Sequence, residues 1–159
     1  VVADPGQDIV KLVVQERNGN SGEIAVGFVK GLGLRRGALG SSVAHDAHPF
    51  VVAGADDLSI LTALAWLREQ GGGLVVCEGE KMLACLPLPV AGLMSDSPLG
   101  VVAGALKMVD QAAGGLGVIG EHPCMALSFL SLSVIPTLKL TDQGYVDLGQ
   151  GGRQDLFVD

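Results

Sequence analysis

The chain has 159 residues, of which 48% are hydrophobic and 17% charged, and its formal net charge is −7. A chain of this length forms one domain with a substantial core, and its low charged fraction argues against intrinsic disorder. The ten basic residues are scattered rather than clustered, which argues against a nucleic acid or an anionic membrane as partner.

No apolar run approaches the roughly 20 residues that a membrane-spanning helix needs. The first residues also lack the basic and apolar regions of a signal peptide. The three cysteines, Cys77, Cys85 and Cys124, show no CxxC spacing, which indicates a reducing compartment in which the thiols serve as small core residues. We therefore expect a cytoplasmic location.

The first third of the chain is rich in strand-forming runs, which fall at residues 9–16, 23–30, 38–44 and 50–53. The Asn- and Gly-rich stretch at 18–22 separates the first two runs and is typical of a hairpin loop. The polar residues 45–48 separate the last two. Pro49 cannot donate a hydrogen bond to a strand ladder, so we expect a loop there.

Helix signals and a second hairpin fill the rest of the chain. Asp56 and Asp57 begin a helix that the glycines at 71–73 end, and a hairpin of residues 74–77 and 82–86 follows. For a second helix we predict Ser97 as cap and Pro98 as first residue. Its apolar stripe consists of Leu99, Val102, Ala103, Leu106 and Val109.

A third, shorter helix is expected between residues 123 and 132. Paired strands with helices between the pairs predict an α+β fold: a mixed, largely antiparallel sheet with two to three packed helices. We expect a single domain at residues 1–147 and a frayed tail at residues 148–159, where glycine and glutamine are frequent.

The candidate chemistry lies at His45, Asp46 and His48, where a polar segment interrupts apolar strand sequence. Two imidazoles with a carboxylate between them are able to relay protons, bind a polar ligand or ligate a metal. The alternative is a polar loop whose side chains bond nearby backbone. A catalytic metal needs at least three protein ligands, and nothing in the sequence requires His122 to join the pair, so we assign no metal site to this chain.

Other catalytic motifs are missing from the sequence. It contains no GxGxxG or GxxxxGK[ST] phosphate loop, and Ser41 and Ser42 do not lie in a GxSxG nucleophile elbow. The glycines at 31, 33 and 37 lack the fingerprint spacing and are typical of turns.

Five blocks, in order and spread over most of the chain, resemble the C-terminal domain of bacterial and archaeal adenine deaminases, members of the amidohydrolase superfamily. They are ER at 16–17, GFVKGLGL at 27–34, SSVAHDAH at 41–48, LPLPVAGLMS at 86–95, and a last block from LSFL at 127–130 through VIP at 134–136 to LKLTD at 138–142. The resemblance leaves open whether the chain is an excised domain, a fragment or a stand-alone relative.

The resemblance implies hydrolysis of adenine to hypoxanthine and ammonia with a divalent metal (Mn, Fe or Zn) held in an amino-terminal barrel domain. That barrel and a small purine are the implied partners, and a homodimer is a further expectation. In this chain His45, Asp46 and His48 are then the catalytic candidates, and Ser41 and Ser42 the substrate-binding ones.

Two positions depart from the family pattern: Asn18 follows the Glu-Arg pair, where a histidine is usual, and Pro49 stands where an asparagine is usual. We expect the chain to be inactive alone. The alternative function is a non-catalytic ligand-binding or assembly module that keeps the scaffold.

Overall fold

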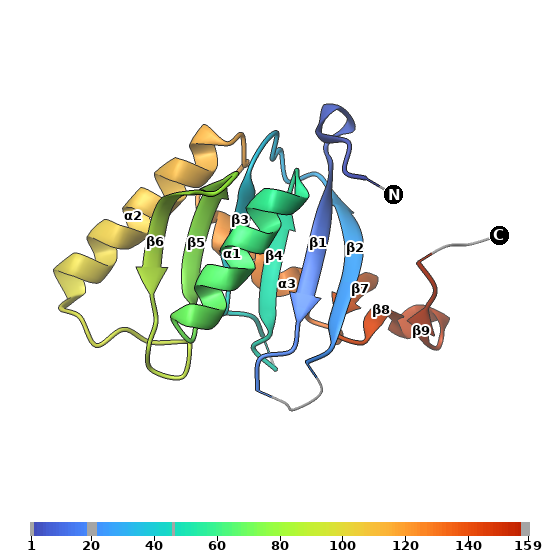
Figure 1. Ribbon diagram of the computed structural model, residues 1–159. Coiled ribbons are helices and arrows are strands. Elements are labelled where there is room, and N and C mark those ends of the chain that lie inside the picture. Colours follow the sequence, from blue (N-terminus) through green and yellow to red (C-terminus); the bar gives the residue numbers. More distant parts are fainter. Residues whose placement is uncertain (1, 19–21, 46, 157–159) are drawn as a thin grey trace.

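The computed structural model describes residues 2–18, 22–45 and 47–156. Within these residues a six-stranded sheet runs in the order β2-β1-β4-β3-β5-β6 (Figure 1), and each neighbouring pair is antiparallel. Its strands are β1 (Ile9–Gln15), β2 (Ile24–Lys30), β3 (Ala38–Ser41), β4 (Phe50–Gly54), β5 (Gly73–Glu78) and β6 (Lys81–Pro87).

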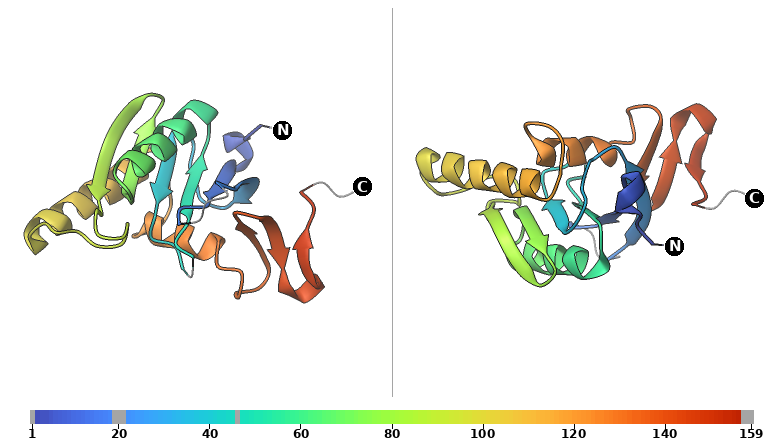
Figure 2. Two further views of the ribbon diagram at one scale, coloured as in Figure 1. Left: turned by 60° about the horizontal axis from the view of Figure 1, so that its bottom comes forward. Right: turned by 90° about the horizontal axis from the view of Figure 1, so that it is seen from above.

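Helices cover both faces of this sheet, so the molecule has three layers (Figure 2). Helix α1 (Asp57–Glu69) lies alone on one face. Helices α2 (Leu99–Gly115) and α3 (Pro123–Leu130) lie on the other, next to a small second sheet. The expected α+β fold with a largely antiparallel sheet and two to three helices is confirmed.

The core follows from the two-residue alternation of side chains along a strand. In β1, Val13 packs in the cluster under α1, whereas Val10 and Val14 pack in the larger cluster under α2 and α3. In β4, Val52 packs in the cluster under α1 and Val51 packs in the larger cluster. Because both faces are covered, these strands are apolar almost throughout, which explains their strength as sequence signals.

The start of α2 differs from the prediction. Pro98 is the N-cap residue, with an extended backbone (ψ 144°) and no side-chain cap. Its carbonyl accepts from the backbone N–H of Val101 and of Val102, which closes the first turn one residue later than expected. The prediction that Ser97 caps the helix and that Pro98 is its first residue is therefore wrong.

The apolar stripe of α2 is buried only toward its C-terminal end. Val109 is fully buried, whereas the side chain of Leu99 is 84% exposed. Figure 1 shows the reason: the amino-terminal end of α2 projects past the edge strand β6 and has no layer beneath it.

A second sheet, which the sequence did not predict, consists of β7 (Leu138–Thr141), β8 (Gly144–Asp147) and β9 (Gly152–Gln154) in that order. Two short 3-10 helices, η1 (Pro5–Gln7) and η2 (Leu148–Gln150), complete the described elements. Residues 148–154 therefore include a strand paired with β8. The domain boundary at residue 147 and the fraying beyond it stay predictions.

Among the described residues, no helix combines the length and the apolar character needed to cross a membrane.

Candidate functional site

The candidate histidines lie in the loop of residues 42–49, between β3 and β4. His45 is exposed, and its ring centroid lies 5.1 Å from that of Phe129 on α3, with the planes tilted by 51°. His48 is partly buried, with a left-handed backbone (φ 47°), and its buried Nδ1 has no hydrogen-bond partner within residues 2–18, 22–45 and 47–156. Asp46, the third catalytic candidate, lies outside the described residues.

Arg17 fixes this loop from the end of β1. Its Nε donates to the carbonyl oxygen of His48 at 2.9 Å, and its Nη1 donates to that of Ala91 at 2.7 Å. Burial lowers the pKa of the Arg17 guanidinium, which nevertheless stays charged at neutral pH. One cation thus links the histidine loop to the segment after β6, through hydrogen bonds strengthened by charge.

Gly92 makes room for this guanidinium. Its φ is 68°, a left-handed conformation that glycine adopts without strain, and a Cβ at this position would overlap Arg17 Nη1. The loop is held from the same side by Asn18, whose Nδ2 donates to the carbonyl of Ala47 at 3.4 Å.

Ser41 and Ser42 are fully buried at the start of the loop. Ser42 Oγ accepts from the backbone N–H of Gly73 at 2.7 Å and donates to the carbonyl of Gly92 at 2.5 Å. Ser41 Oγ accepts from the N–H of Val43 at 3.0 Å. Both hydroxyls therefore bond backbone in this structure, and their contact with a substrate stays a prediction.

A pocket of about 460 Å³ adjoins Arg17 on the side of α1. Gln15 lines it with only 3% of its surface exposed, and its Oε1 has no hydrogen-bond partner among the described atoms. Arg68 and Phe50 line it as well. The described histidines of the loop do not line this pocket, but the bond from Arg17 to His48 connects the two.

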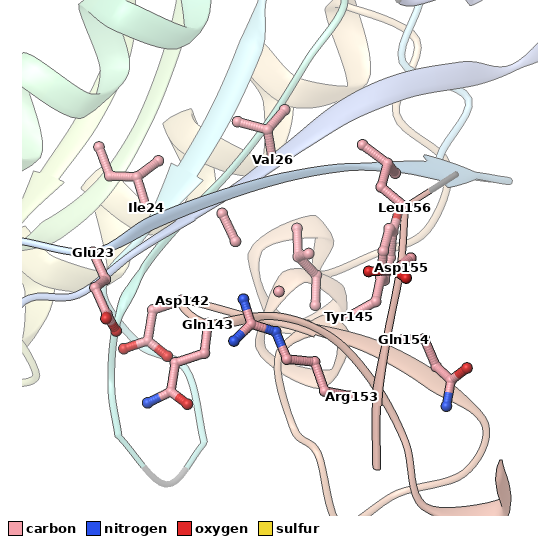
Figure 3. Close-up of a pocket in the computed structure, with 13 residues that line it drawn as sticks. Glu23, Ile24, Val26, Asp142, Gln143, Tyr145, Arg153, Gln154, Asp155 and Leu156 are labelled. Carbon is pink, nitrogen blue, oxygen red and sulfur yellow. The ribbon is translucent and has the colours of Figure 1, made fainter. Parts of the chain in front are cut away.

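A second pocket, of about 520 Å³, lies between β2 and the small sheet (Figure 3). Figure 3 shows the Arg153 side chain extending into it, with Asp142 and Asp155 on either side. The polar lining suits a hydrated groove between two sheets. It contains no sequence-predicted site residue.

The described histidines do not converge on a metal site. His122 precedes α3, where its Nδ1 lies 3.5 Å from Asp110 Oδ2. Phe129, which contacts His45, lies seven residues further along that helix, or about 10 Å at 1.5 Å per residue. Within residues 2–18, 22–45 and 47–156, no group of three or more His, Cys, Asp or Glu side chains is placed to hold a metal ion.

Known proteins match the chain over nearly its whole length. Residues 1–151 match the model of the adenine deaminase C-terminal domain. The chain is 50% identical over 156 residues to the adenine deaminase of Desulfatibacillum aliphaticivorans, a match covering 98% of this chain and 27% of that protein. It is 51% identical over 147 residues to that of Oleidesulfovibrio alaskensis, covering 92% of this chain and 26% of that protein.

The chain belongs to the adenine deaminase C-terminal domain family. It spans only 26–27% of the length of these two relatives. Most of each relative therefore lies outside the match.

Within this C-terminal domain, the loop that carries His45 and His48 was predicted from the sequence, but the residues that hold it were not. Arg17 donates to the backbone carbonyls of His48 and Ala91. Every residue has a backbone carbonyl, so the sequence does not show which ones accept a hydrogen bond from an arginine. The glycines at 72, 73 and 92 were the only hint of close packing at this site among the described residues, because a Cβ at each would overlap a neighbouring segment.

Proposed function

We propose that this chain acts as the C-terminal domain of an adenine deaminase-type hydrolase, which converts adenine and water to hypoxanthine and ammonia. In this role it covers or completes a metal site held by a barrel domain in the amino-terminal part of the polypeptide. The observation that carries the proposal is the family match, which covers almost all of this chain and about a quarter of each relative.

In this proposal the metal ion is held by the barrel domain. A divalent ion (Mn, Fe or Zn) lowers the pKa of a bound water and so supplies the nucleophile near neutral pH. The described side chains of this chain do not offer a three-ligand group for it. The contribution proposed for this chain is to exclude bulk water from the barrel mouth and to bring polar groups to it.

The histidine loop is the part of this chain best suited to that task. The buried Nδ1 of His48 has no hydrogen-bond partner among the residues that the structure describes, and His45 is exposed at the surface. We propose that one of them relays a proton during departure of ammonia, and that Asp46 accepts a hydrogen bond from an N–H of the purine. For Ser41 and Ser42 we propose an indirect role, since their hydroxyls hold the start of this loop.

Anchoring of the loop backbone supports this assignment. Arg17 fixes the carbonyl of His48, and Ser42 joins the other end of the loop to the backbone of Gly73 and Gly92. Side chains on an anchored loop lose less conformational entropy when a substrate binds, which favours a catalytic or binding role.

A non-catalytic assembly module is the second candidate. Two observations favour it: Asn18 bonds the carbonyl of Ala47, and Pro49 is buried in the loop. At these positions the family resemblance leads one to expect a histidine and an asparagine, so two polar groups of the expected site are replaced.

The test is a chimera in which this chain replaces the matching segment of the Desulfatibacillum aliphaticivorans adenine deaminase. Ammonia release from adenine is measured with Mn²⁺ for the chimera, for the parent enzyme, and for the parent lacking the segment. The proposal expects activity in the chimera and its loss in the truncated protein. A chimera that folds but releases no ammonia favours the assembly module, and a truncated protein of full activity contradicts the proposed function.

A further inference from the structure

Exposed apolar side chains gather on the outer side of α3 and on the segment that follows it. Met125 and Phe129, four residues apart and therefore on one helix face, are 59% and 41% exposed. Val134 and Ile135 are 64% and 37% exposed. We call these four side chains the α3 patch. Figure 2 shows α3 between α2 and the small sheet, on the face opposite α1.

The sequence around the α3 patch lacks charge. The 17 residues from His122 to Leu138 contain no Lys, Arg, Asp or Glu, in a chain of which 17% is charged. The cores of protein interfaces are depleted in charge and enriched in Met and aromatic residues. Contiguous exposed apolar patches on a protein surface commonly mark a site that binds another protein.

Other apolar side chains are also exposed. Leu61 on α1 is 63% exposed, but that helix also carries Asp57 and Arg68. Leu99 is the first residue of α2, whose amino-terminal end projects past β6 (Figure 1). The α3 patch is distinguished by its contact with the histidine loop, since the ring of Phe129 packs against that of His45. A surface that covers Phe129 therefore comes close to His45.

We propose that the α3 patch is the surface on which the amino-terminal part of the adenine deaminase polypeptide docks, which places His45 at the edge of the interface. This inference rests on the proposed function and adds the face that is used. The length of the relatives indicates which partner covers the patch. About three quarters of each relative lies outside the match, and that larger part has to lie against this domain if the two share a site. Docking there removes the exposed apolar surface from water.

The proposal is tested by amide hydrogen exchange. Exchange is compared between the 159-residue chain and the chimera described above. Docking predicts at least about tenfold slower exchange for residues 123–135 in the chimera, because contacts that exist only in the docked form reduce local opening. Peptides of α1, on the opposite face, serve as the internal reference and should not change.

Substitutions identify the patch. Phe129→Glu in the chimera should abolish the added protection, whereas Leu61→Glu, an equally drastic change at an exposed leucine on the opposite face, should leave it intact. Urea unfolding of the 159-residue chain with Phe129→Glu shows whether the domain itself survives. If it does not, Met125→Glu, at a more exposed position, replaces it.

Three results overturn the inference. The first is equal exchange of α3 in the chain and in the chimera. The second is an equal effect of Phe129→Glu and Leu61→Glu on the protection of α3. The third is protection of α3 that appears in the chain alone as its concentration rises, because this would assign the patch to a second copy of the chain. An inactive chimera with a protected α3 leaves the docking inference standing and contradicts the proposed function. An active chimera with an unprotected α3 does the reverse.

Discussion

The hydroxyl of Tyr145 makes two hydrogen bonds to the backbone of Phe28. The N–H of Phe28 donates to Tyr145 Oη at 2.7 Å, and the hydroxyl donates to the Phe28 carbonyl oxygen at 3.2 Å. Phe28 lies on β2, an edge strand of the six-stranded sheet, and Tyr145 lies on β8 of the small sheet. One side chain therefore takes the place of a neighbouring strand at this edge, which is otherwise open to pairing with other chains.

Tyr145→Phe tests this link with the least possible change. It removes one oxygen and leaves the N–H and C=O of Phe28 without their partner, so we expect the free energy of unfolding to fall by about 1–2 kcal/mol. Urea unfolding followed by circular dichroism measures the change. A loss of less than a few tenths of a kcal/mol would show that water replaces the hydroxyl at no cost.

Gly27→Ala should be destabilising mainly while Tyr145 is present. A Cβ at Gly27 would overlap Tyr145 Oη and Cζ and would lie tightly against the end of the Leu140 side chain. We expect Gly27→Ala to cost at least about 1 kcal/mol in the native background and clearly less in a Tyr145→Ala background. A double-mutant cycle from urea unfolding gives the coupling. Additive effects of the two changes contradict the packing described.

The six-stranded sheet could be predicted because its signals are local. Each strand is a largely apolar run, and the hairpin turns contain glycine. Asp56 is the N-cap of α1, and its side chain accepts from the N–H of Ser59 as an N-cap should. The runs predicted at 9–16 and 50–53 lie within one residue of the observed β1 and β4.

The small sheet could not be predicted in this way. Its strands have three or four residues each, too few to show a period. Its position depends on the contact of Tyr145 with Phe28, 117 residues away in the sequence. The exposure of the first turns of α2 could not be predicted either, because an apolar stripe on a helix does not show how far the sheet extends beneath that helix.

The candidate site was located only in part. His45 and His48 stand out because they interrupt apolar strand sequence, but Arg17 acts through backbone carbonyls and leaves no pattern in the sequence. For Ser41 and Ser42 the sequence does not reveal the backbone hydrogen bonds that their buried hydroxyls make, and their contact with a substrate stays a prediction.

Arg17→Lys in the chimera should reduce turnover without abolishing folding. A lysine keeps the charge but lacks the rigid fork that bonds the carbonyls of His48 and Ala91 together, so the loop loses its fixed position. We expect kcat to fall about tenfold or more while KM changes less than about twofold. Arg68→Ala, which removes another arginine from the same pocket, is the control and should keep kcat. Equal losses in both variants would reject a positioning role for Arg17.

Alkaline pH should destabilise the domain through its buried thiols. Burial, with a smaller contribution from the charge of Asp110, raises the pKa of Cys124 to about 12 from an ordinary value of 9.0. The unfolded thiol loses its proton above about pH 9 while the folded one keeps it, so the free energy of unfolding falls as pH rises from about 9 toward 12. Each such thiol contributes at most about 1.4 kcal/mol per pH unit.

The measurement is urea unfolding at pH 8 and pH 10 for the native chain and for Cys124→Ala. We expect a smaller loss of stability between the two pH values in the variant, even though the variant is less stable at pH 8. An identical pH dependence in both proteins would show that other groups account for the alkaline loss.

The histidine loop is the part of this chain most directly required by the proposed function, and Asp46→Ala in an active chimera tests its role. The substitution should lower the kcat for ammonia release from adenine by well over about tenfold, because the purine loses an acceptor for its N–H group. Asp96→Ala, an exposed carboxylate of the segment after β6, is the matched control and should keep the kcat of the chimera. A kcat for Asp46→Ala equal to that of the control would contradict the claim that this domain completes the active site.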